Sequence, residues 1–224
     1  MVRHNRLKYL SSFVADRLLE ERQSDISGKL QIYLSQGKIK LCTKNATYSF
    51  EEYYSVFEKG FAALNIGARN FNNVLILGFG LGSVLILLKH IYKLNFNCTA
   101  VELDATIISL AQKYTDPKFL ANTTIVNADA YNWVLQNKAL HSTFDLIIVD
   151  LFVDKITESK FFENTFIKHN KALLNKNGLL LYNTLSSNKN KKQLKQYFSN
   201  QFNPLFKQSE LFKFGYNFLL VGYS

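Results

Sequence analysis

The chain has 224 residues and is 47% hydrophobic, which is enough for the core of one domain with a small appendage. Its 27 Lys and Arg residues outnumber its 17 Asp and Glu residues and give a formal net charge of +10. This charge permits an anionic partner such as nucleic acid or a phosphorylated substrate. However, the lysines are scattered and no RNA- or DNA-binding motif accompanies them, so nucleic acid is not the expected partner.

The sequence also predicts a cytoplasmic protein without a membrane segment. The N-terminus has no apolar core of signal-peptide length. The longest uncharged apolar stretch, residues 74–88, is shorter than the ~20 residues of a membrane-spanning helix. Cys42 and Cys98 lie in apolar segments, which favours buried free thiols in a reducing compartment. The histidines lack the spacing of ligands, so no metal is expected.

The N-terminal part, residues 1–64, is expected to form a unit of its own beside the main domain, residues 65–224. Residues 1–27 predict a helix, because the apolar side chains between Leu7 and Leu18 fall roughly on one helical face.

A β-hairpin is predicted next, over residues 28–48, where polar and apolar residues alternate around a turn at Gly37. Residues 50–64 then predict a helix that leads into the first strand of the main domain.

From Asn73 onward, strand-like and helix-like segments alternate, which predicts a parallel sheet covered by helices on both faces. The expected strands are residues 73–77, 98–102, 123–127, 145–150 and 178–184. The expected helices are residues 83–94, 104–114, 130–138, 158–174 and 189–201.

The end of the chain breaks this alternation. Residues 204–214 and 216–223 are strand-like and only Gly215 separates them, so a hairpin must join them and one strand must run antiparallel. The predicted fold class is therefore α/β: a Rossmann-like, seven-stranded, mostly parallel sheet with an antiparallel C-terminal hairpin, plus the small N-terminal helix and β-hairpin.

The glycine turn after the first strand of this sheet is the most informative motif. Gly78, Gly80 and Gly82 permit a sharp turn and a close approach to a ligand. A helix begins at Ser83, and the free N–H groups of its first turn face whatever lies over the glycines. The next strand ends at Glu102, at the spacing where a carboxylate can accept hydrogen bonds from both hydroxyls of a ribose. Together these features predict an adenosine-type cofactor.

Two classes of cofactor fit this pattern. NAD-binding folds share the glycine turn and the acidic strand end, but they usually continue into a substrate domain and prefer Gly or Ala at the position of Ser83. A parallel sheet that ends in an antiparallel hairpin instead resembles the class I S-adenosylmethionine-dependent methyltransferase fold. S-adenosylmethionine is therefore favoured over NAD.

Four segments resemble, in order and spacing, the spermidine synthase superfamily. These segments are residues 74–85, 101–104, 126–130 and 144–150. The resemblance extends over roughly residues 30–223, because the upstream β-hairpin and the helix near Tyr53 and Tyr54 also lie where that family keeps its N-terminal β-structure and its substrate-side helix.

The resemblance implies a role for each polar strand end. The glycines would pass under the amino-acid part of the cofactor, and Glu102 would hold the ribose hydroxyls. Asp129 would accept a hydrogen bond from the adenine amino group. Asp150, the predicted catalytic residue, would face the sulfonium and the incoming nucleophile. The full set of implied cofactor-binding residues is Gly78, Phe79, Gly80, Gly82, Glu102, Leu103, Asp129, Ala130, Asp150 and Leu151.

Three aspartates also have structural interpretations. Asp104 is expected to cap the helix over residues 104–114 rather than to touch the cofactor. Asp129 also precedes a helix, so capping competes with adenine binding there. Asp145 is expected to be structural.

Four departures from the family bear on function. Leu81 stands where the family's glycine turn carries an Asp that helps to exclude a donor with a carboxylate, so intact S-adenosylmethionine would be admitted. The family's Tyr of the substrate-side helix is lost unless Tyr53 or Tyr54 replaces it. The Gln of its N-terminal hairpin has no clear equivalent near Lys40.

The fourth departure is the spacing after the fourth strand, where Asp150 and Asp154 are separated by three residues instead of two. A diamine needs carboxylates at both ends of a narrow channel. This departure makes polyamine synthesis a less favoured interpretation. The segment after Asp150 looks more like the spermidine-synthase-like branch of the superfamily.

The leading hypothesis is therefore methyl transfer from S-adenosylmethionine to a small acceptor. The alternative is an aminopropyltransferase that uses decarboxylated S-adenosylmethionine and a diamine. A non-catalytic cofactor-binding module is a third interpretation, and nucleic-acid methylation a fourth, although the sequence after Asp150 lacks the signature of amino-directed base methylases. A homodimer is compatible with all of them.

Overall fold

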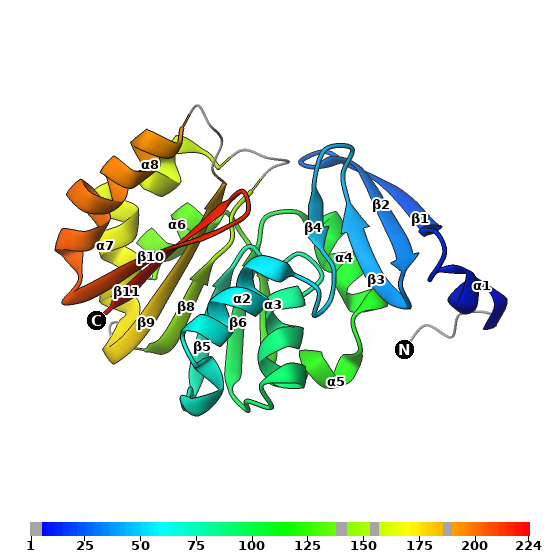
Figure 1. Cartoon of the computed structure of the whole chain (residues 1–224), viewed down its shortest axis with the longest axis horizontal. Helices are drawn as coiled ribbons and strands as arrows, with labels where there is room; N and C mark the ends of the chain where they lie inside the picture. The colour runs from blue at the N-terminus through cyan, green and yellow to red at the C-terminus, as the bar shows by residue number, and fades with distance from the viewer. Residues whose placement is uncertain (1–5, 138–142, 153–156, 186–189) are drawn as a thin grey trace.

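The computed structural model describes residues 6–137, 143–152, 157–185 and 190–224. The strands of its main sheet are β5 (Asn73–Leu77), β6 (Asn97–Glu102), β7 (Thr123–Asn127), β8 (Phe144–Val149), β9 (Leu174–Leu185), β10 (Gln208–Phe214) and β11 (Asn217–Tyr223). They lie in the order β10-β11-β9-β8-β5-β6-β7 (Figure 1). The strands from β9 to β7 are parallel, β11 is antiparallel to β9, and β10 is antiparallel to β11. The predicted fold class is confirmed.

Alternation along the strands divides the core into two layers. In β5, Val74 and Ile76 enter one apolar cluster while Leu75 and Leu77 enter the other, because successive side chains of a strand point to opposite faces. The first cluster also receives side chains from α2 (Ser55–Ala63), α3 (Ser83–Ile86) and α4 (Ala105–Tyr114). The second is covered by α6 (Ala130–Gln136), α7 (Asn164–Leu173) and α8 (Lys191–Tyr197).

Several helices are shorter than predicted or change type at their ends. The helix expected over residues 158–174 is a 3₁₀ turn, Ser159–Phe162, followed by α7, and β9 already begins at Leu174. Both α3 and α8 continue as π-helical turns, Leu87–Ile91 and Phe198–Phe202. A short helix, α5 (Pro117–Leu120), precedes β7. None of the helices in the described part of the chain combines the length and the apolar surface needed to cross a bilayer.

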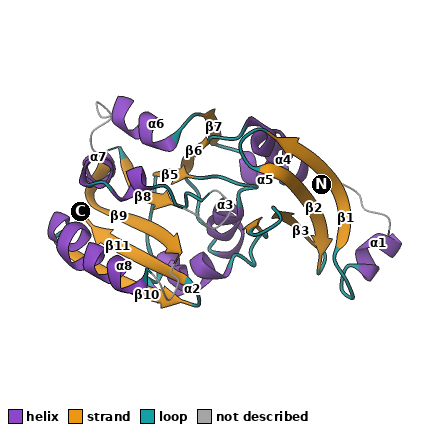
Figure 2. Cartoon of the chain, turned by 90° about the horizontal axis from the view of Figure 1, so that it is seen from above, coloured by secondary structure: helices purple, strands orange, loops and turns teal. Residues whose placement is uncertain are grey.

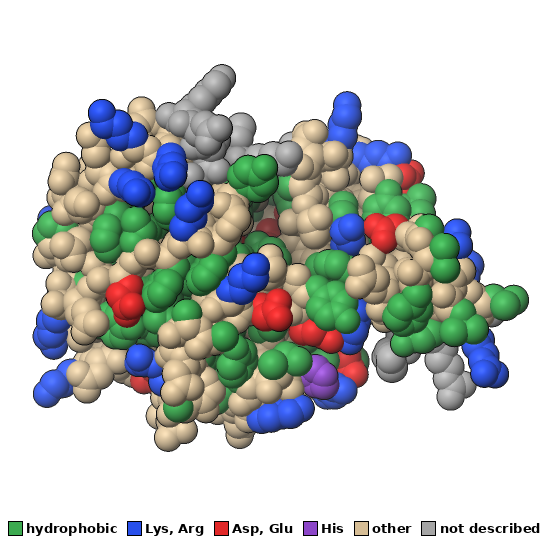
Figure 3. Space-filling view, viewed as in Figure 1, with side chains coloured by type: hydrophobic (Ala, Val, Ile, Leu, Met, Phe, Trp, Pro, Cys, Tyr) green, Lys and Arg blue, Asp and Glu red, His purple; other side chains and the backbone are tan. Residues whose placement is uncertain are grey.

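The predicted helix over residues 1–27 is wrong. Among residues 6–27, the described part of this range, only α1 (Arg6–Ser11) is helical, and β1 (Arg17–Ser24) pairs antiparallel with β2 (Gly28–Ser35). The apolar side chains used for the prediction stay largely exposed, since Leu7 is 75% exposed and Val14 88%. Apolar side chains accordingly gather on the surface around α1 (Figure 3). Pairing with β2 therefore outweighs the local helical pattern.

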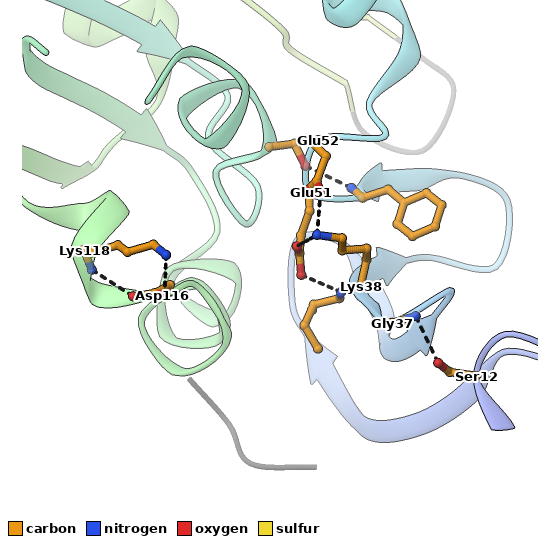
Figure 4. A network of polar contacts seen from close by, with 10 residues as sticks. Ser12, Gly37, Lys38, Glu51, Glu52, Asp116 and Lys118 are labelled. Atoms are coloured by element: carbon orange, nitrogen blue, oxygen red, sulfur yellow. Dashed lines mark hydrogen bonds and ion pairs between the residues drawn. The ribbon is translucent and has the colours of Figure 1, made fainter. Parts of the chain in front are cut away.

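The predicted N-terminal hairpin is part of a larger sheet. Strands β3 (Lys38–Cys42) and β4 (Thr47–Ser49) complete a four-stranded antiparallel sheet of order β1-β2-β3-β4, which stands beside the main sheet (Figure 2). At the start of β3, the Lys38 side chain lies between two carboxylates: its Nζ is 2.5 Å from Glu52 Oε1 and 3.6 Å from Glu51 Oε2 (Figure 4). This cluster fixes the segment that leads from the N-terminal sheet into α2.

Two hydroxyl groups join the N-terminal sheet to the glycine turn. The Oγ of Ser49, at the end of β4, accepts a hydrogen bond from the Leu81 amide at 2.8 Å. The Oγ of Ser83 accepts one from the Phe50 amide at 2.9 Å. The N-terminal sheet is thus held directly against the edge of the main sheet where the predicted site residues lie.

Candidate active site

A cavity of about 850 Å³ opens at the carboxyl ends of the parallel strands. It lies between the N-terminal sheet, the glycine turn and the tip of the C-terminal hairpin, and Figure 3 shows the molecule hollowed between that hairpin and the N-terminal sheet. Nine of the ten predicted cofactor-binding residues line it, namely Gly78, Phe79, Gly80, Glu102, Leu103, Asp129, Ala130, Asp150 and Leu151. Ligands of open α/β sheets bind at this edge.

The remaining predicted residue, Gly82, does not line the cavity. It has φ +79 and precedes α3 as its N-cap, and a Cβ there would press on the Phe79 ring. Its role is to begin the helix. Leu81 is buried, with 5% exposure, and is not among the lining residues either.

The glycines at 78 and 80 are needed chiefly because protein groups approach them. Gly78 has φ +88, and a Cβ there would overlap the Asp150 carbonyl oxygen. Gly80 has φ +55, and its Cβ would meet Ser49 Oγ. Only glycine adopts such angles at little cost. The turn is therefore shaped by contact with β8 and β4 as well as by the space that it leaves for a ligand.

Glu102 clamps the glycine turn from the end of β6. Its Oε2 accepts hydrogen bonds from the amides of Phe79 at 3.1 Å and Gly80 at 3.0 Å, and its Oε1 accepts one from Asp104 at 3.0 Å. Burial raises the pKa of Glu102, and these three amides oppose that rise. A carboxylate has about four acceptor positions, so its capacity for a ligand hydroxyl is reduced but not exhausted.

Asp104 caps α4 as expected. Its Oδ1 accepts a hydrogen bond from the Thr106 amide at 2.9 Å, while Ser24, at the end of β1, donates to Oδ2 at 2.5 Å. The same carboxylate also lines the cavity. It therefore joins the N-terminal sheet to the end of β6, beside Glu102.

Asp129 has two partners in the protein. Its Oδ1 accepts a hydrogen bond from the Asn132 amide at 2.9 Å and so caps α6, and its Oδ2 lies 2.9 Å from Lys160 Nζ. Burial favours a higher pKa for Asp129, but these bonds outweigh it and the pKa is lowered. An ionised carboxylate is thus held at the cavity wall, where it remains available as an acceptor, and its role toward adenine stays a prediction.

Asp150 follows β8 and faces the cavity. Burial raises the pKa of its carboxyl to about 6, against the opposing hydrogen bonds from Asn183 and Tyr54, and the nearby charge of Glu102 adds to the rise. Asn183 Nδ2 donates to Asp150 Oδ1 at 2.8 Å. A carboxylate with a pKa near neutrality suits a group that must both hold and release a proton.

Of the two tyrosines that the sequence left open, Tyr54 is the one that lies at the cavity. It precedes α2, lines the cavity and hydrogen-bonds to Asp150, whereas Tyr53 is 45% exposed and is not among the lining residues. Burial, followed by the charge of Asp150, raises the pKa of the Tyr54 hydroxyl well above its usual value. The hydroxyl is therefore a neutral donor. Asp154 lies outside the described residues.

Asn183 was not identified from the sequence. It is 1% exposed and, with Thr184 after it, follows the apolar buried run Leu179–Tyr182 of β9. A polar residue next to such a run needs a buried partner, and this is the signal that could have identified it. Its partner, Asp150, could not be read from local pattern because the two are 33 residues apart.

The described walls of the cavity carry more acidic than basic side chains, in a chain that is basic overall. Their carboxylates are Glu102, Asp104, Asp129, Asp150 and Glu158, and their lysines are Lys191 and Lys213. Such a wall favours cationic over anionic ligands. Within the described ranges, no three His, Cys, Asp or Glu side chains come together as a metal site would require.

Known proteins resemble this chain in sequence. A family model described as the spermine/spermidine synthase domain matches residues 60–214. A probable polyamine aminopropyl transferase of Bifidobacterium longum (strain NCC 2705) is 32% identical over 116 residues, which are 52% of this chain and 25% of that protein. A polyamine aminopropyltransferase of Vibrio vulnificus (strain CMCP6) is 28% identical over 116 residues, which are 52% of this chain and 38% of that protein. The chain thus matches well under half the length of either relative.

Solved structures agree in fold. A probable spermidine synthase from Corynebacterium glutamicum ATCC 13032 superposes with a TM-score of 0.74 at 18% identity, over 93% of this chain and 80% of that chain. Human methyltransferase-like protein 13, solved in complex with SAH, superposes with a TM-score of 0.60 at 18% identity, over 74% of this chain and 81% of that chain. Together with the family model, which spans more than half of the sequence, these findings establish that the chain belongs to the spermine/spermidine synthase family, with the class I S-adenosylmethionine-dependent methyltransferase-like fold.

Proposed function

We propose that this protein transfers an aminopropyl group from decarboxylated S-adenosylmethionine to a small amine. The sequence analysis ranked methyl transfer first, whereas both curated relatives carry the name of aminopropyltransferases. The observation that carries the proposal is Asp150, a carboxylate with a pKa of about 6 in a cavity whose acidic side chains outnumber its basic ones. Such a group attracts an ammonium ion and can then accept its proton.

The residues present fit a nucleoside donor. The volume of about 850 Å³ is within the range that holds a ligand of this size together with a small acceptor. Glu102 would accept hydrogen bonds from the ribose hydroxyls, and Asp129 would accept one from the adenine amino group. When bound, the donor supplies a carbon activated by the neighbouring sulfonium. The chain then has to orient the amine and remove its proton, and Asp150 with Tyr54 would do both.

The preference for the decarboxylated donor follows from charge. The side chain of Leu81 is buried away from the cavity, so the glycine turn itself does not select the donor at this position. The five carboxylates on the described walls outnumber the two lysines there, even when Lys160, which pairs with Asp129 and Glu158, is counted with them. This excess of negative charge repels a donor that carries its own carboxylate. This repulsion supports aminopropyl rather than methyl transfer.

Calorimetric titration with the two donors tests the proposal. Decarboxylated S-adenosylmethionine should bind about tenfold more tightly than S-adenosylmethionine, since a like-charge contact costs roughly 1 kcal/mol or more. Equal binding, or tighter binding of S-adenosylmethionine accompanied by methyl transfer, would restore the methyltransferase hypothesis. Binding without turnover of any amine would instead favour a non-catalytic module.

A further inference from the structure

A chain of two amides connects the tip of the C-terminal hairpin to Asp150. Asn217, the first residue of β11, donates from Nδ2 to Asn183 Oδ1 at 2.9 Å. Asn183 in turn donates from Nδ2 to Asp150 Oδ1 at 2.8 Å. Both asparagines come from the antiparallel pair β9–β11, in which Asn217 lies opposite Leu185. The chain of bonds therefore exists only where the hairpin is docked on β9.

The ionised carboxylate fixes the direction of these bonds. Asp150 can only accept when it is ionised, so Asn183 must turn its NH₂ group toward it. The Oδ1 of Asn183 then faces Asn217, which must present its own NH₂ group. With either amide reversed, two acceptor oxygens would face each other. Because Asn183 is 1% exposed, water cannot easily relieve such a contact.

We propose that Asn183 and Asn217 are positioning residues that orient the Asp150 carboxylate and favour its ionised form. Through them, the C-terminal hairpin would set the proton affinity of the base. The same hairpin tip supplies Tyr216 and Asn217 to the cavity wall, so the element that holds the base also borders the acceptor space. The catalytic consequence rests on the proposed function, whereas the effect on the proton affinity of Asp150 does not.

The other groups that face Asp150 act in defined directions. Tyr54, from the start of α2, donates a hydrogen bond and favours the ionised form. Glu102, from β6, acts by charge and favours the protonated form. Since Tyr54 and Glu102 belong to other elements, removing Asn217 leaves both in place and isolates the contribution of the hairpin.

The chain contains a matched control at the opposite end of the same strands. Asn175, on β9, donates from Nδ2 to Asp145 Oδ1 on β8 at 2.6 Å. Burial favours a higher pKa for Asp145, but the bond from Asn175, with the amides of Asn73 and Asn72, lowers it. Neither Asn175 nor Asp145 lines the cavity. The variant Asn175→Ala therefore removes an equivalent Asn–Asp bond without touching the site.

The test measures the pKa of Asp150 directly, by ¹³C NMR of the carboxyl groups in protein labelled at Asp, with Asp150→Asn to assign the signal. In Asn217→Ala the pKa should rise by roughly 0.5–1 unit, because the donor to Asp150 loses its orientation. In Asn183→Leu, which removes the donor itself, the rise should be larger. In Asn175→Ala the pKa of Asp145 should rise while that of Asp150 stays unchanged.

Two results would overturn the proposal. One is an unchanged Asp150 titration in folded Asn217→Ala, and the other is an equal shift of Asp150 in Asn175→Ala. Asn217 is only half-buried, so its variant decides the question even where Asn183→Leu fails to fold. In the active enzyme, the acidic limb of kcat/KM should move to higher pH together with the NMR value. Absence of turnover in the wild-type protein would count against the proposed function alone, since the titration requires no substrate.

Discussion

At Asp150, burial raises the pKa of the carboxyl group and hydrogen bonding lowers it. Burial prevails, and the pKa of about 6 lies well above the value of about 3.9 for an aspartate in an unfolded chain. The fold therefore holds a carboxylate that resists ionisation at the place where a reacting amine would lose a proton. A buried carboxylate with a raised pKa destabilises the folded protein, so its presence is better explained by function than by stability.

This balance predicts that Asp150→Asn stabilises the protein while it abolishes turnover. Because the folded pKa is raised, the native state is penalised for ionising Asp150 above pH 6 but not below pH 4. At pH 8 the free energy of unfolding of the variant should exceed that of wild type by up to about 3 kcal/mol, and at pH 4 the two should agree to within about 0.5 kcal/mol. Denaturant titration at both pH values measures the difference.

Turnover of the same variant should fall by about a hundredfold or more, with donor affinity nearly unchanged. A variant that is no more stable at pH 8 would show that Asp150 ionises freely. One that retains turnover would remove Asp150 from the chemistry.

Glu102 is expected to control donor affinity. The substitution Glu102→Ala removes the acceptor for the ribose hydroxyls and also releases the amides of Phe79 and Gly80, so binding of the donor should weaken about tenfold or more. Calorimetry measures the affinity, and circular dichroism checks that the fold persists. Glu163→Ala serves as a control, because Glu163 bonds Tyr131 and does not line the cavity. Unchanged affinity in Glu102→Ala would exclude the carboxylate from the site.

At the scale of elements, the N-terminal sheet is docked onto α4 through Glu20. Its Oε2 receives hydrogen bonds from Lys113 Nζ and Tyr114 Oη, both at 2.6 Å. These bonds, from Lys113 first and then Tyr114, lower the pKa of Glu20 to about 2. The sheet forms one wall of the cavity, so this contact also shapes the site.

Substituting Glu20 should therefore weaken the docking in a pH-dependent way. Because the folded pKa lies below the unfolded value, the contribution is present above about pH 4.5 and is lost as pH falls toward 2. At pH 7, Glu20→Gln should lower the free energy of unfolding by about 1 kcal/mol, since the lysine is half exposed and screened by solvent.

The neighbouring variant Glu21→Gln is the matched control, because Glu21 bonds only Lys29 and Gln31 on the adjacent strand among the described contacts. Hydrogen exchange of the β1 and β2 amides should report the loosening in Glu20→Gln and not in Glu21→Gln. Equal exchange in the two variants would contradict a docking role for Glu20.

Elements with strong periodicity were predictable, and elements fixed by distant partners were not. The strands of the parallel sheet follow from their apolar runs, because each must be buried on both faces. The strand β1 does not, since its sequence is charged and its pairing with β2 decides its structure. The predicted helix over residues 1–27 failed for this reason.

At the scale of the whole molecule, the same distinction applies to the site. Glu102 and Asp150 could be predicted because each ends a recognisable strand, and all such ends meet at one edge. Tyr54 was only one of two candidates, since its position depends on how the N-terminal sheet meets α2. Asn183 and Asn217 join the site through the pairing of β9 with β11, which no local pattern encodes.

The cavity itself is a property of the assembled chain. Residues of the glycine turn, the strand ends, the N-terminal sheet and the C-terminal hairpin all line it. The N-terminal sheet and the C-terminal hairpin lie on opposite sides of the glycine turn (Figure 1). Its acidic character within a chain of net charge +10 arises because carboxylates at several strand ends converge there. The whole fold is thus arranged to present negative charge at one edge of the sheet, which suits a cationic amine and a sulfonium donor.

The most direct test of this account is the mass of the amine product. The protein is supplied with decarboxylated S-adenosylmethionine and S-adenosylmethionine together and with a panel of small mono- and diamines, and the acceptors are analysed by mass spectrometry. The account predicts acceptors that gain an aminopropyl group, and loss of that product in Asp150→Asn. Acceptors that gain only a methyl group would contradict it.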